Sequence, residues 1–180
     1  EDWSFPYYRD GAYCIGSGMT AREQLLSFLA KADDPNSGGR QMPQHYGHKD
    51  LRIVSQSSPT GTQFLQAVGC AMVCKMGKTK EVVYVSAGEG TTSQGDFHEA
   101  LNWASNSKAP VIFHIQDNEY AISTHRSEQT ASSIYDMTSG YGNLSRYDVD
   151  GTDFFETSLA FKEAVQLSLI HISEPTRHTR

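Results

Sequence analysis

Two short apolar runs, residues 81–86 (EVVYVS) and 110–116 (PVIFHIQ), constrain the fold of this chain more than any other feature. Both runs are rich in β-branched and aromatic residues and have the length of buried strands. Residues 95–107 between them have the pattern of a helix, and so do residues 63–76 before the first run. Strands that alternate with helices at this spacing predict a parallel sheet. We therefore expect an α/β fold, an open and mostly parallel sheet with helices on both faces.

Three further elements are predicted outside this unit. Thr20 and Glu23 have the spacing of a capping box, in which a hydroxyl and a carboxylate accept bonds from free amides of the first turn. They predict a helix over residues 21–31. We also expect a third strand within residues 142–149 and a helix over residues 154–167.

The chain is expected to divide into a loop-rich N-terminal part, residues 1–50, and the core of the domain, residues 51–166. Residues 167–180 are expected to be a non-native tail, because residues 167–177 (LSLIHISEPTR) resemble the translation of a DNA sequencing adapter. The alternative is an ordinary C-terminal strand and basic tail. Since the chain begins at Glu1 without a leader, we expect a piece of a longer protein, truncated at its C-terminus.

Composition narrows the possible partners. The 180 residues contain 15 Lys and Arg against 21 Asp and Glu, which gives a net charge of −6. Nucleic-acid binders need a basic face, so we expect no nucleic-acid partner. The apolar runs are too short to cross a bilayer, so no membrane partner is expected. Three cysteines at unremarkable spacing, Cys14, Cys70 and Cys74, favour a reducing compartment over a disulfide framework.

Polar residues follow both predicted strands. Gly88, Glu89 and Gly90 come directly after the first run, and Asn118 comes soon after the second. The carboxyl ends of neighbouring parallel strands meet in one crevice, so we expect Glu89 and Asn118 to face each other there. One carboxylate and one amide oxygen suit Mg²⁺, which takes its other ligands from water and phosphates. The alternative is two tight strand–helix turns with solvated polar side chains.

Four segments carry a resemblance to a known family. Residues 86–104 (SAGEGTTSQGDFHEALNWA) and 115–129 (IQDNEYAISTHRSEQ) resemble the alpha half of the decarboxylase component of 2-oxoacid dehydrogenases. Residues 39–48 (GRQMPQHYGH) and 55–63 (SQSSPTGTQ) are similar to the branched-chain, 2-oxoisovalerate member, either as a separate alpha subunit or as the alpha half of a fused form. The resemblance covers residues 7–163. It implies a thiamin diphosphate-binding fold with Mg²⁺.

The resemblance also implies roles for individual residues. Magnesium would be held by Glu89, Asn118 and the backbone oxygen of Tyr120. Contacts to thiamin diphosphate would come from several loops: Tyr8, Arg9, Ser58, Thr60, Gly88, Gly90, Thr91 and Gln116.

A potassium ion, K⁺, is implied for the segment before the helix of residues 63–76. Its ligands would be Ser57, the carbonyl of Pro59, Thr62 and Gln63. The alternative for this segment is a proline turn followed by the N-cap of the helix. His45 is the candidate catalytic residue, in a position to touch substrate; the alternative is an exposed loop histidine.

Two residues depart from the family pattern. Gln116 stands where some relatives carry an arginine that reaches the diphosphate, so one positive contact is missing. Glu119 replaces a glycine that is often found between Asn118 and Tyr120. It adds a charge and a Cβ to a turn where we expect positive φ.

The implied activity is oxidative decarboxylation of branched-chain 2-oxoacids with acyl transfer to a lipoyl group. The implied partners are a beta subunit or beta half and a lipoyl-bearing acyltransferase.

Two groups needed for turnover, a downstream histidine and a glutamate of the beta half, lie outside these residues, so we expect the piece to be inactive alone. The location would be the cytoplasm of a bacterium or the mitochondrial matrix of a eukaryote. The alternatives are a pyruvate- or acetoin-type dehydrogenase and a non-catalytic assembly subunit.

Other motifs do not support a competing function. Residues 16–21 (GSGMTA) fit a dinucleotide fingerprint, but an adequate strand does not precede them. His45 and His48 lie in a glycine- and proline-rich loop without a partner that would complete a zinc site. His114 falls inside a predicted strand and is expected to be a hydrogen-bonded core residue.

Overall fold

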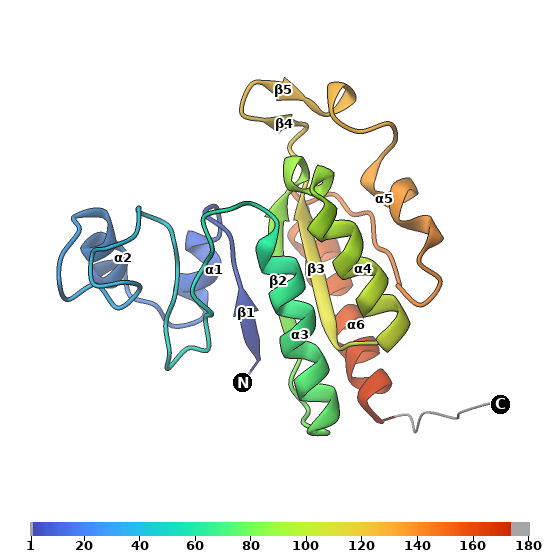
Figure 1. Cartoon of the computed structure of the whole chain (residues 1–180), viewed down its shortest axis with the longest axis horizontal. Helices are drawn as coiled ribbons and strands as arrows, with labels where there is room; N and C mark the ends of the chain where they lie inside the picture. The colour runs from blue at the N-terminus through green and yellow to red at the C-terminus, as the bar shows by residue number, and fades with distance from the viewer. Residues whose placement is uncertain (1, 174–180) are drawn as a thin grey trace.

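A parallel sheet of three strands forms the centre of the fold in a computed structural model, which describes residues 2–173. The strands are β1 (Trp3–Phe5), β2 (Val83–Gly88) and β3 (Val111–Gln116), in the order β1-β2-β3 (Figure 1). Both neighbouring pairs are parallel, and Gly88 pairs with Gln116. The predicted parallel sheet is thus confirmed. Its third strand is β1, which the sequence analysis did not predict.

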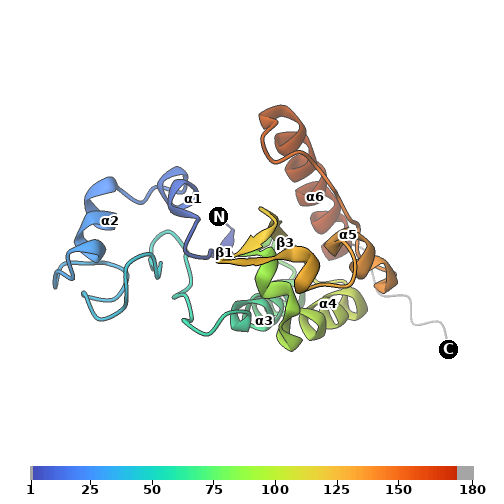
Figure 2. The same ribbon diagram turned by 90° about the horizontal axis from the view of Figure 1, so that it is seen from above.

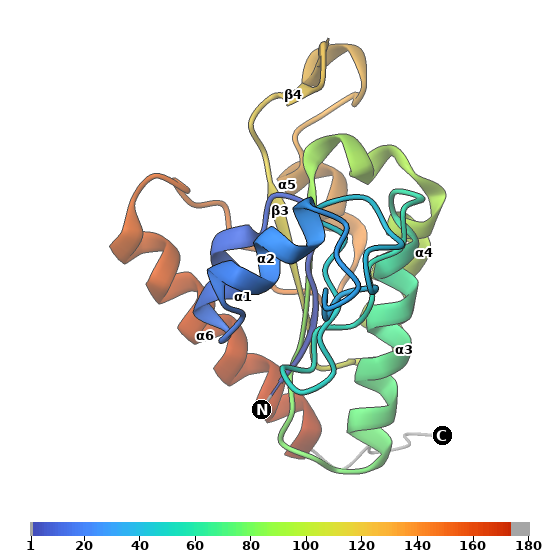
Figure 3. The same ribbon diagram turned by 90° about the vertical axis from the view of Figure 1, so that its left-hand side faces the viewer.

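Helices cover both faces of the sheet, as predicted. α3 (Thr62–Met76) and α4 (Gly95–Ser107) lie against one face, and α6 (Phe154–Ser173) lies against the other (Figures 2 and 3). The two faces differ because side chains alternate along each strand. Alternate β2 residues belong to the apolar core with α3 and α4, whereas Tyr84 packs against Phe161 of α6.

The apolar core lies between the sheet and the pair α3 and α4. Phe64 of α3 and Phe97 of α4 are fully buried, and their ring centres are 5.0 Å apart. Each large buried side chain contributes about 2–3 kcal/mol through loss of water contact. The core therefore fixes where β2 and β3 end, and with them the loops that follow.

A separate group of short helices and loops precedes α3 and lies beside β1 (Figure 1). It contains α1 (Gly11–Gly16) and α2 (Ala21–Phe28). Both bonds of the predicted capping box are present at Thr20 and Glu23. α2 ends earlier than expected, because Ala30 takes a positive φ of 47° that a helix cannot continue through. Residues 16–21 join two helices, which confirms that they are no dinucleotide fingerprint.

In the last part of the chain one expected strand is absent and the expected helix is present but longer than predicted. Residues 142–149 form no strand within the described part of the chain. Their polar groups bond elsewhere: Asn143 donates to Ser105 of α4 rather than to β3. α6 continues past residue 167 to Ser173, and the Ser168 hydroxyl bonds back to the carbonyl of Ala164. The expectations for residues 174–180 lie outside the described residues.

The remaining elements are short and join the larger ones: η1 (Glu89–Ser93), β4 (Tyr120–Ala121), β5 (Thr124–His125), η2 (Arg126–Glu128), α5 (Ile134–Met137) and η3 (Thr138–Gly140). β4 and β5 form a two-stranded antiparallel hairpin that stands beyond the end of the sheet (Figure 1). Within residues 2–173, the structure contains no helix with the length and apolar character that crossing a bilayer requires.

Candidate functional site

Three loops meet where the strands of the sheet end. They follow β1 at Tyr7, β2 at Glu89 and β3 at Asp117. Hydrogen bonds join them: the Tyr7 hydroxyl donates to Oε1 of Gln116 at 2.9 Å, and the Tyr7 amide donates to the Ser86 hydroxyl at 3.2 Å. The carboxyl ends of parallel strands are the usual ligand site of such folds. These bonds join the turn after β1 to the ends of β2 and β3; that Glu89 and Asn118 face each other across this edge stays a prediction.

Glu89 is the most unusual group at this edge. Its side chain is 2% exposed, and its Oε1 has no hydrogen-bond partner among the residues that the structure describes. A buried carboxylate oxygen without a partner costs free energy unless a cation or donor compensates it. The Thr92 hydroxyl donates to the backbone carbonyl of Glu89 at 2.7 Å and holds the turn in place. Glu89 is therefore a fixed oxygen ligand suited to a cation.

Gly90 lies next to the β4–β5 hairpin. A Cβ at Gly90 would lie 2.6 Å from the Cβ of Ala121, which is too close for any other residue. Gln129 donates from Nε2 to the Gly90 carbonyl at 2.9 Å. The glycine thus lets the hairpin approach the turn that carries Glu89.

The turn after β3 is tight and exposed. The amide of Tyr120 donates to Oδ1 of Asn118 at 3.0 Å, so one lone pair of that oxygen is used within the turn. Glu119 has a φ of 67°, which confirms the expected positive φ at the position where the family often has glycine. Arg126 forms ion pairs with Asp117 and Glu119 that hold the turn.

Tyr8 and Arg9 lie on the surface in the loop after β1. The Arg9 guanidinium stacks over the Tyr8 ring at 5.2 Å, and its Nη1 is 3.7 Å from where a Gly88 Cβ would be. Burial opposes the charge of Arg9, but a hydrogen bond with Tyr7 and the nearby Tyr7, Tyr8 and Glu89 raise its pKa. Arg9 therefore places positive charge beside the Gly88–Glu89 corner.

The segment before α3 lies beside the same edge. Gln63 donates from Nε2 to the Ser86 carbonyl at 3.3 Å, and a Cβ at Gly61 would lie 3.1 Å from the Gln94 Cβ that follows η1. The Ser58 hydroxyl is 2.7 Å from Nε2 of His45, so two residues predicted from separate motifs form one pair. Ser58 and Thr60 are exposed, whereas Thr91 in η1 is buried.

Two of the four groups predicted to bind potassium bond to each other in this structure, and a third, Gln63, bonds to a neighbouring amide. The Thr62 hydroxyl donates to the Pro59 carbonyl at 2.7 Å, and Oε1 of Gln63 accepts from the Gly61 amide at 3.1 Å. The alternative for this segment, a turn at Pro59 followed by the N-cap of α3, is confirmed, although the cap is made by backbone alone. The cap position of α3 is Gly61, which has no side chain and a φ of 98°.

Two residues of this edge were missed in the sequence, Asp10 and Ser86. Asp10 is 4% exposed and accepts from Ser86 Oγ and from Nε2 of Gln116 at 2.7 Å. A hydroxyl inside the buried run of residues 81–86 was a signal that a polar partner had to exist. His114 is hydrogen-bonded, as expected, but it is only partly buried and lies outside the apolar core: its Nδ1 is 2.9 Å from the Tyr84 hydroxyl, and burial lowers its pKa.

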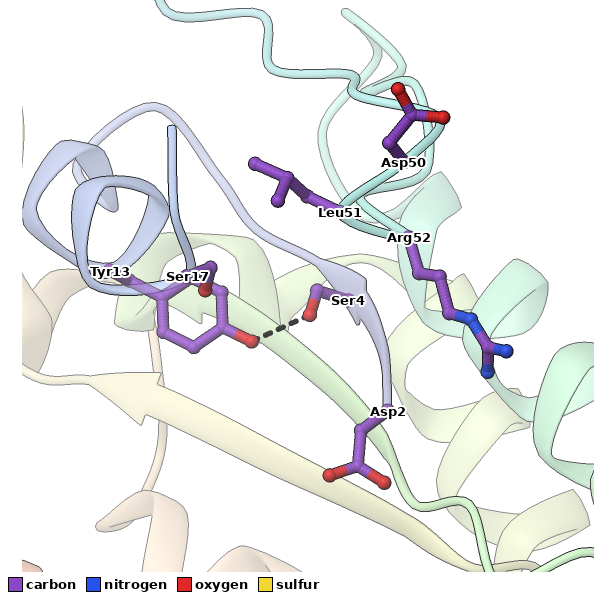
Figure 4. Close-up of a pocket in the computed structure, with 7 residues that line it drawn as sticks. All are labelled: Asp2, Ser4, Tyr13, Ser17, Asp50, Leu51 and Arg52. Carbon is purple, nitrogen blue, oxygen red and sulfur yellow. Dashed lines mark hydrogen bonds between the residues drawn. The ribbon is translucent and has the colours of Figure 1, made fainter. Parts of the chain in front are cut away.

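A polar hollow of about 550 Å³ lies elsewhere, beside β1 and α1 (Figure 4). Most of the polar side chains that line it already have partners. Ser4 bonds to Tyr13 at 2.6 Å, Asp2 accepts from the Val82 amide at 2.8 Å, and Arg52 pairs with Glu81. None of the predicted site residues lines this hollow, so we place the candidate site at the strand ends.

The donor set at the strand ends suits a cation that brings most of its own ligands. Within the described residues, no three His, Cys, Asp or Glu side chains cluster to hold a metal. A magnesium diphosphate needs no such cluster, because phosphate and water oxygens complete the coordination. The unpartnered oxygen of Glu89, with backbone beside it at Gly88 and Gly90, fits this requirement.

Comparison with known proteins gives a consistent result. The family model described as "Dehydrogenase E1 component" matches residues 1–169. The chain is 48% identical over 164 residues to the 2-oxoisovalerate dehydrogenase subunit alpha of Bacillus subtilis, covering 91% of this chain and 49% of that protein. It is 38% identical over 171 residues to the mitochondrial 2-oxoisovalerate dehydrogenase subunit alpha of Caenorhabditis elegans, covering 94% of this chain and 39% of that protein. The chain spans about half the length of these curated relatives, or less.

Proposed function

The chain belongs to the dehydrogenase E1 component family, and we propose that it forms the part of a 2-oxoacid decarboxylase that binds the magnesium and diphosphate end of thiamin diphosphate. Proteins of this family depend on thiamin diphosphate. The observation that carries the proposal is Glu89, a buried carboxylate with an unpartnered oxygen directly after a strand of a parallel sheet. Membership of a thiamin diphosphate-dependent family supports the magnesium diphosphate of that cofactor as the proposed ligand of this oxygen.

Magnesium would be held by the side chains of Glu89 and Asn118 and by the carbonyl of Tyr120. The amide oxygen of Asn118 has a second lone pair beyond the one used by the Tyr120 amide. Glu89 is fixed by its turn, whereas Asn118 and Tyr120 lie in the exposed turn after β3. Binding the cation would therefore join the buried turn to the exposed one.

The diphosphate would contact Tyr8, Arg9, Gly90 and Thr91. Arg9 suits this role because its planar guanidinium binds pairs of phosphate oxygens, and it already lies at the Gly88–Glu89 corner. Ser58 and Thr60 would lie along the rest of the cofactor. When bound, thiamin diphosphate supplies the electron sink for the loss of carbon dioxide, and these residues place it.

His45 is proposed as the residue of this chain that meets the substrate. Its Nδ1 is 3.3 Å from the Pro43 carbonyl and its Nε2 is 2.7 Å from the Ser58 hydroxyl. A neutral ring that donates from Nδ1 to Pro43 accepts at Nε2 from Ser58. Ser58 would thus fix the tautomer and orientation in which His45 moves a proton.

A potassium ion is proposed for the segment of Ser57, Pro59, Thr62 and Gln63. It would replace the bond from the Thr62 hydroxyl to the Pro59 carbonyl and stiffen the turn before α3. The supporting observation is that carbonyl and hydroxyl oxygens, which alkali cations prefer, already converge there.

The substrate and partners are proposed from the names of the relatives. Both relatives described above are 2-oxoisovalerate dehydrogenase alpha subunits, so the proposed substrate is a branched-chain 2-oxoacid and the proposed partners are a beta subunit or beta half and a lipoyl-bearing acyltransferase. The two relatives come from a bacterium and from mitochondria, so the proposed location is the cytoplasm or the mitochondrial matrix accordingly.

Calorimetric titration of thiamin diphosphate into the complete enzyme tests the proposal. In the presence of Mg²⁺ we expect tight binding that Glu89→Ala abolishes and that Glu99→Ala, at an exposed position of α4, leaves unchanged. Unchanged magnesium-dependent binding in Glu89→Ala would contradict the proposed site. Turnover of 3-methyl-2-oxobutanoate against pyruvate tests the substrate, and a preference for pyruvate would identify a pyruvate-type enzyme instead.

A further inference from the structure

A closed ring of buried and partly buried hydrogen bonds links the ends of all three strands behind the candidate site. The Asp10 carboxylate accepts from the Gln116 amide at 2.7 Å, from the Tyr7 backbone amide at 3.3 Å and from the Ser86 hydroxyl. Oε1 of Gln116 accepts in turn from the Tyr7 hydroxyl at 2.9 Å. Tyr7, Asp10 and Ser86 are all nearly inaccessible to solvent.

The Asp10 side chain bonds to this ring instead of capping the helix that begins beside it. It occupies the N-cap position of α1, where an aspartate side chain ordinarily accepts from an amide of the first turn. Within the described residues, its side chain makes no such bond and points back to the sheet instead. Departures from a local rule of this kind tend to occur at functional sites.

Both polar atoms of the Gln116 side chain bond within the ring. Its carbonyl oxygen accepts from Tyr7 and its amide nitrogen donates to Asp10, so it must be both donor and acceptor. A glutamine amide offers both in neutral form, whereas an arginine side chain can only donate. Gln116 therefore does not replace the arginine that reaches the diphosphate in some relatives.

The ring encloses the loop that carries Arg9. Tyr7 and Asp10 bracket that loop, and the Asp10 amide donates to the Tyr7 carbonyl at 2.9 Å, which closes the turn. Cε2 of Tyr7 and Nη1 of Arg9 both border Gly88, at 3.8 and 3.7 Å from its Cβ position. Holding the two ends of so short a loop limits where the guanidinium can lie.

We propose that Asp10 and Gln116 are positioning residues that fix the Tyr7–Asp10 turn so that Arg9 is held ready for the diphosphate of the cofactor. This inference rests on the proposed function, because it assigns a purpose to Arg9 only if a diphosphate binds there. Ser86 supports the ring from β2. The ring acts on the ligand through Arg9 alone.

A double-mutant cycle between Arg9 and Gln116 tests the inference in the complete enzyme. The readout is the Kd of thiamin diphosphate at saturating Mg²⁺, measured by calorimetry. Arg9→Gln should weaken binding about tenfold or more, as expected for loss of a charge-assisted pair. Gln116→Leu should weaken it several-fold. The double variant should bind no worse than Arg9→Gln within about twofold, because both changes remove the same contact.

Val111→Ala is the matched control. Val111 is buried at the other end of β3, so its truncation destabilises the same strand without touching the ring. It should lower the midpoint of thermal unfolding and leave the Kd within about twofold, alone or with Arg9→Gln. If Gln116→Leu does not fold, Tyr7→Phe removes one hydroxyl of the ring and should show the same loss of additivity with Arg9→Gln.

The outcomes separate the inference from the proposed function. If Arg9→Gln leaves the Kd unchanged, the diphosphate does not bind at this corner and the proposed function is wrong. If Arg9→Gln weakens binding and the effect of Gln116→Leu multiplies with it, the ring is only structural and the inference is overturned.

Discussion

On the β1 and β2 side of the candidate site buried hydrogen bonds hold the loops, whereas on the hairpin side exposed ion pairs do so. Asp10 and Ser86 are enclosed by the sheet, and their bonds are shielded from water. Arg126 holds the turn after β3 through Asp117 and Glu119, and all three side chains remain partly in solvent. Buried bonds are costly to break, and exposed pairs are weak and sensitive to salt.

The hairpin side also carries backbone strain. Glu119 and Ile122, with φ of 67° and 59°, both lie on the hairpin side, and Ile122 is 98% exposed. A β-branched residue rarely takes this conformation without a compensating contact. The hairpin side thus combines weak ion pairs with strained backbone, whereas within the described residues the turns directly after β1 and β2, residues 6–10 and 89–93, contain no non-glycine residue with positive φ.

Glu89→Gln should have the largest effect, with opposite signs on stability and binding. It removes a buried charge whose Oε1 has no hydrogen-bond partner, so the free energy of unfolding of the metal-free protein should rise by about 1 kcal/mol. Thiamin diphosphate affinity with Mg²⁺ should fall on the order of 100-fold, because loss of a ligand costs at least as much as loss of an outer contact. Denaturant titration in chelator and calorimetry measure the two. A loss of stability would show that the Glu89 carboxylate already has a partner that compensates its charge.

Gly90→Ala should separate the two sides sterically. The new Cβ would lie 2.6 Å from Ala121, so the hairpin must move away from η1 at a cost of about 1–3 kcal/mol. Gly95→Ala is the matched control, because no atom lies within 4 Å of its Cβ position. Thermal unfolding and the Kd of the cofactor should both worsen for the first variant only. Equal effects in the two variants would mean that the hairpin is not packed against the turn.

The same division explains what the sequence could predict. The patterns of residues 81–86 and 110–116 were strong enough to predict β2 and β3. Because ligands bind at the carboxyl ends of parallel strands, Glu89 and Asn118 could then be predicted as site residues. Asp10 escaped prediction because its partners, Ser86 and Gln116, are distant in the sequence. Long-range pairing of polar side chains leaves no periodic pattern.

The unpredicted strand β1 and the wrongly predicted strand at residues 142–149 both have tertiary causes, which local propensity does not reveal. Residues 142–149 read as a strand, but the structure directs Asn143 to Ser105 at the end of α4. β1 contains only Trp3–Phe5, too short to show alternation, and it exists because β2 offers a free edge. In both cases a tertiary partner decided the outcome.

Glycine at the strained positions should stabilise the hairpin side. Glu119→Gly and Ile122→Gly each relieve a positive φ, and we expect a gain of about 0.5–1 kcal/mol after the added freedom of the unfolded chain is subtracted. Ser123→Gly is the control, because Ser123 has no positive φ to relieve and should lose stability. Denaturant titration measures all three. If Ile122→Gly destabilises the protein, the side chain has a contact that offsets its strain.

Arg126→Gln should have the smallest effect and show the sharpest contrast with Asp10→Asn. Loss of the Asp117 pair should cost at most about 1 kcal/mol in low salt, and the cost should largely vanish near 1 M NaCl, because exposed charges are screened. Asp10→Asn weakens buried charge-assisted bonds, so its cost of about 1.5–3 kcal/mol should persist at both salt concentrations. Denaturant titration at the two concentrations compares them. A salt-insensitive cost at Arg126 would mean that the hairpin side is as shielded as the other, because screening acts only on charges that solvent ions can approach.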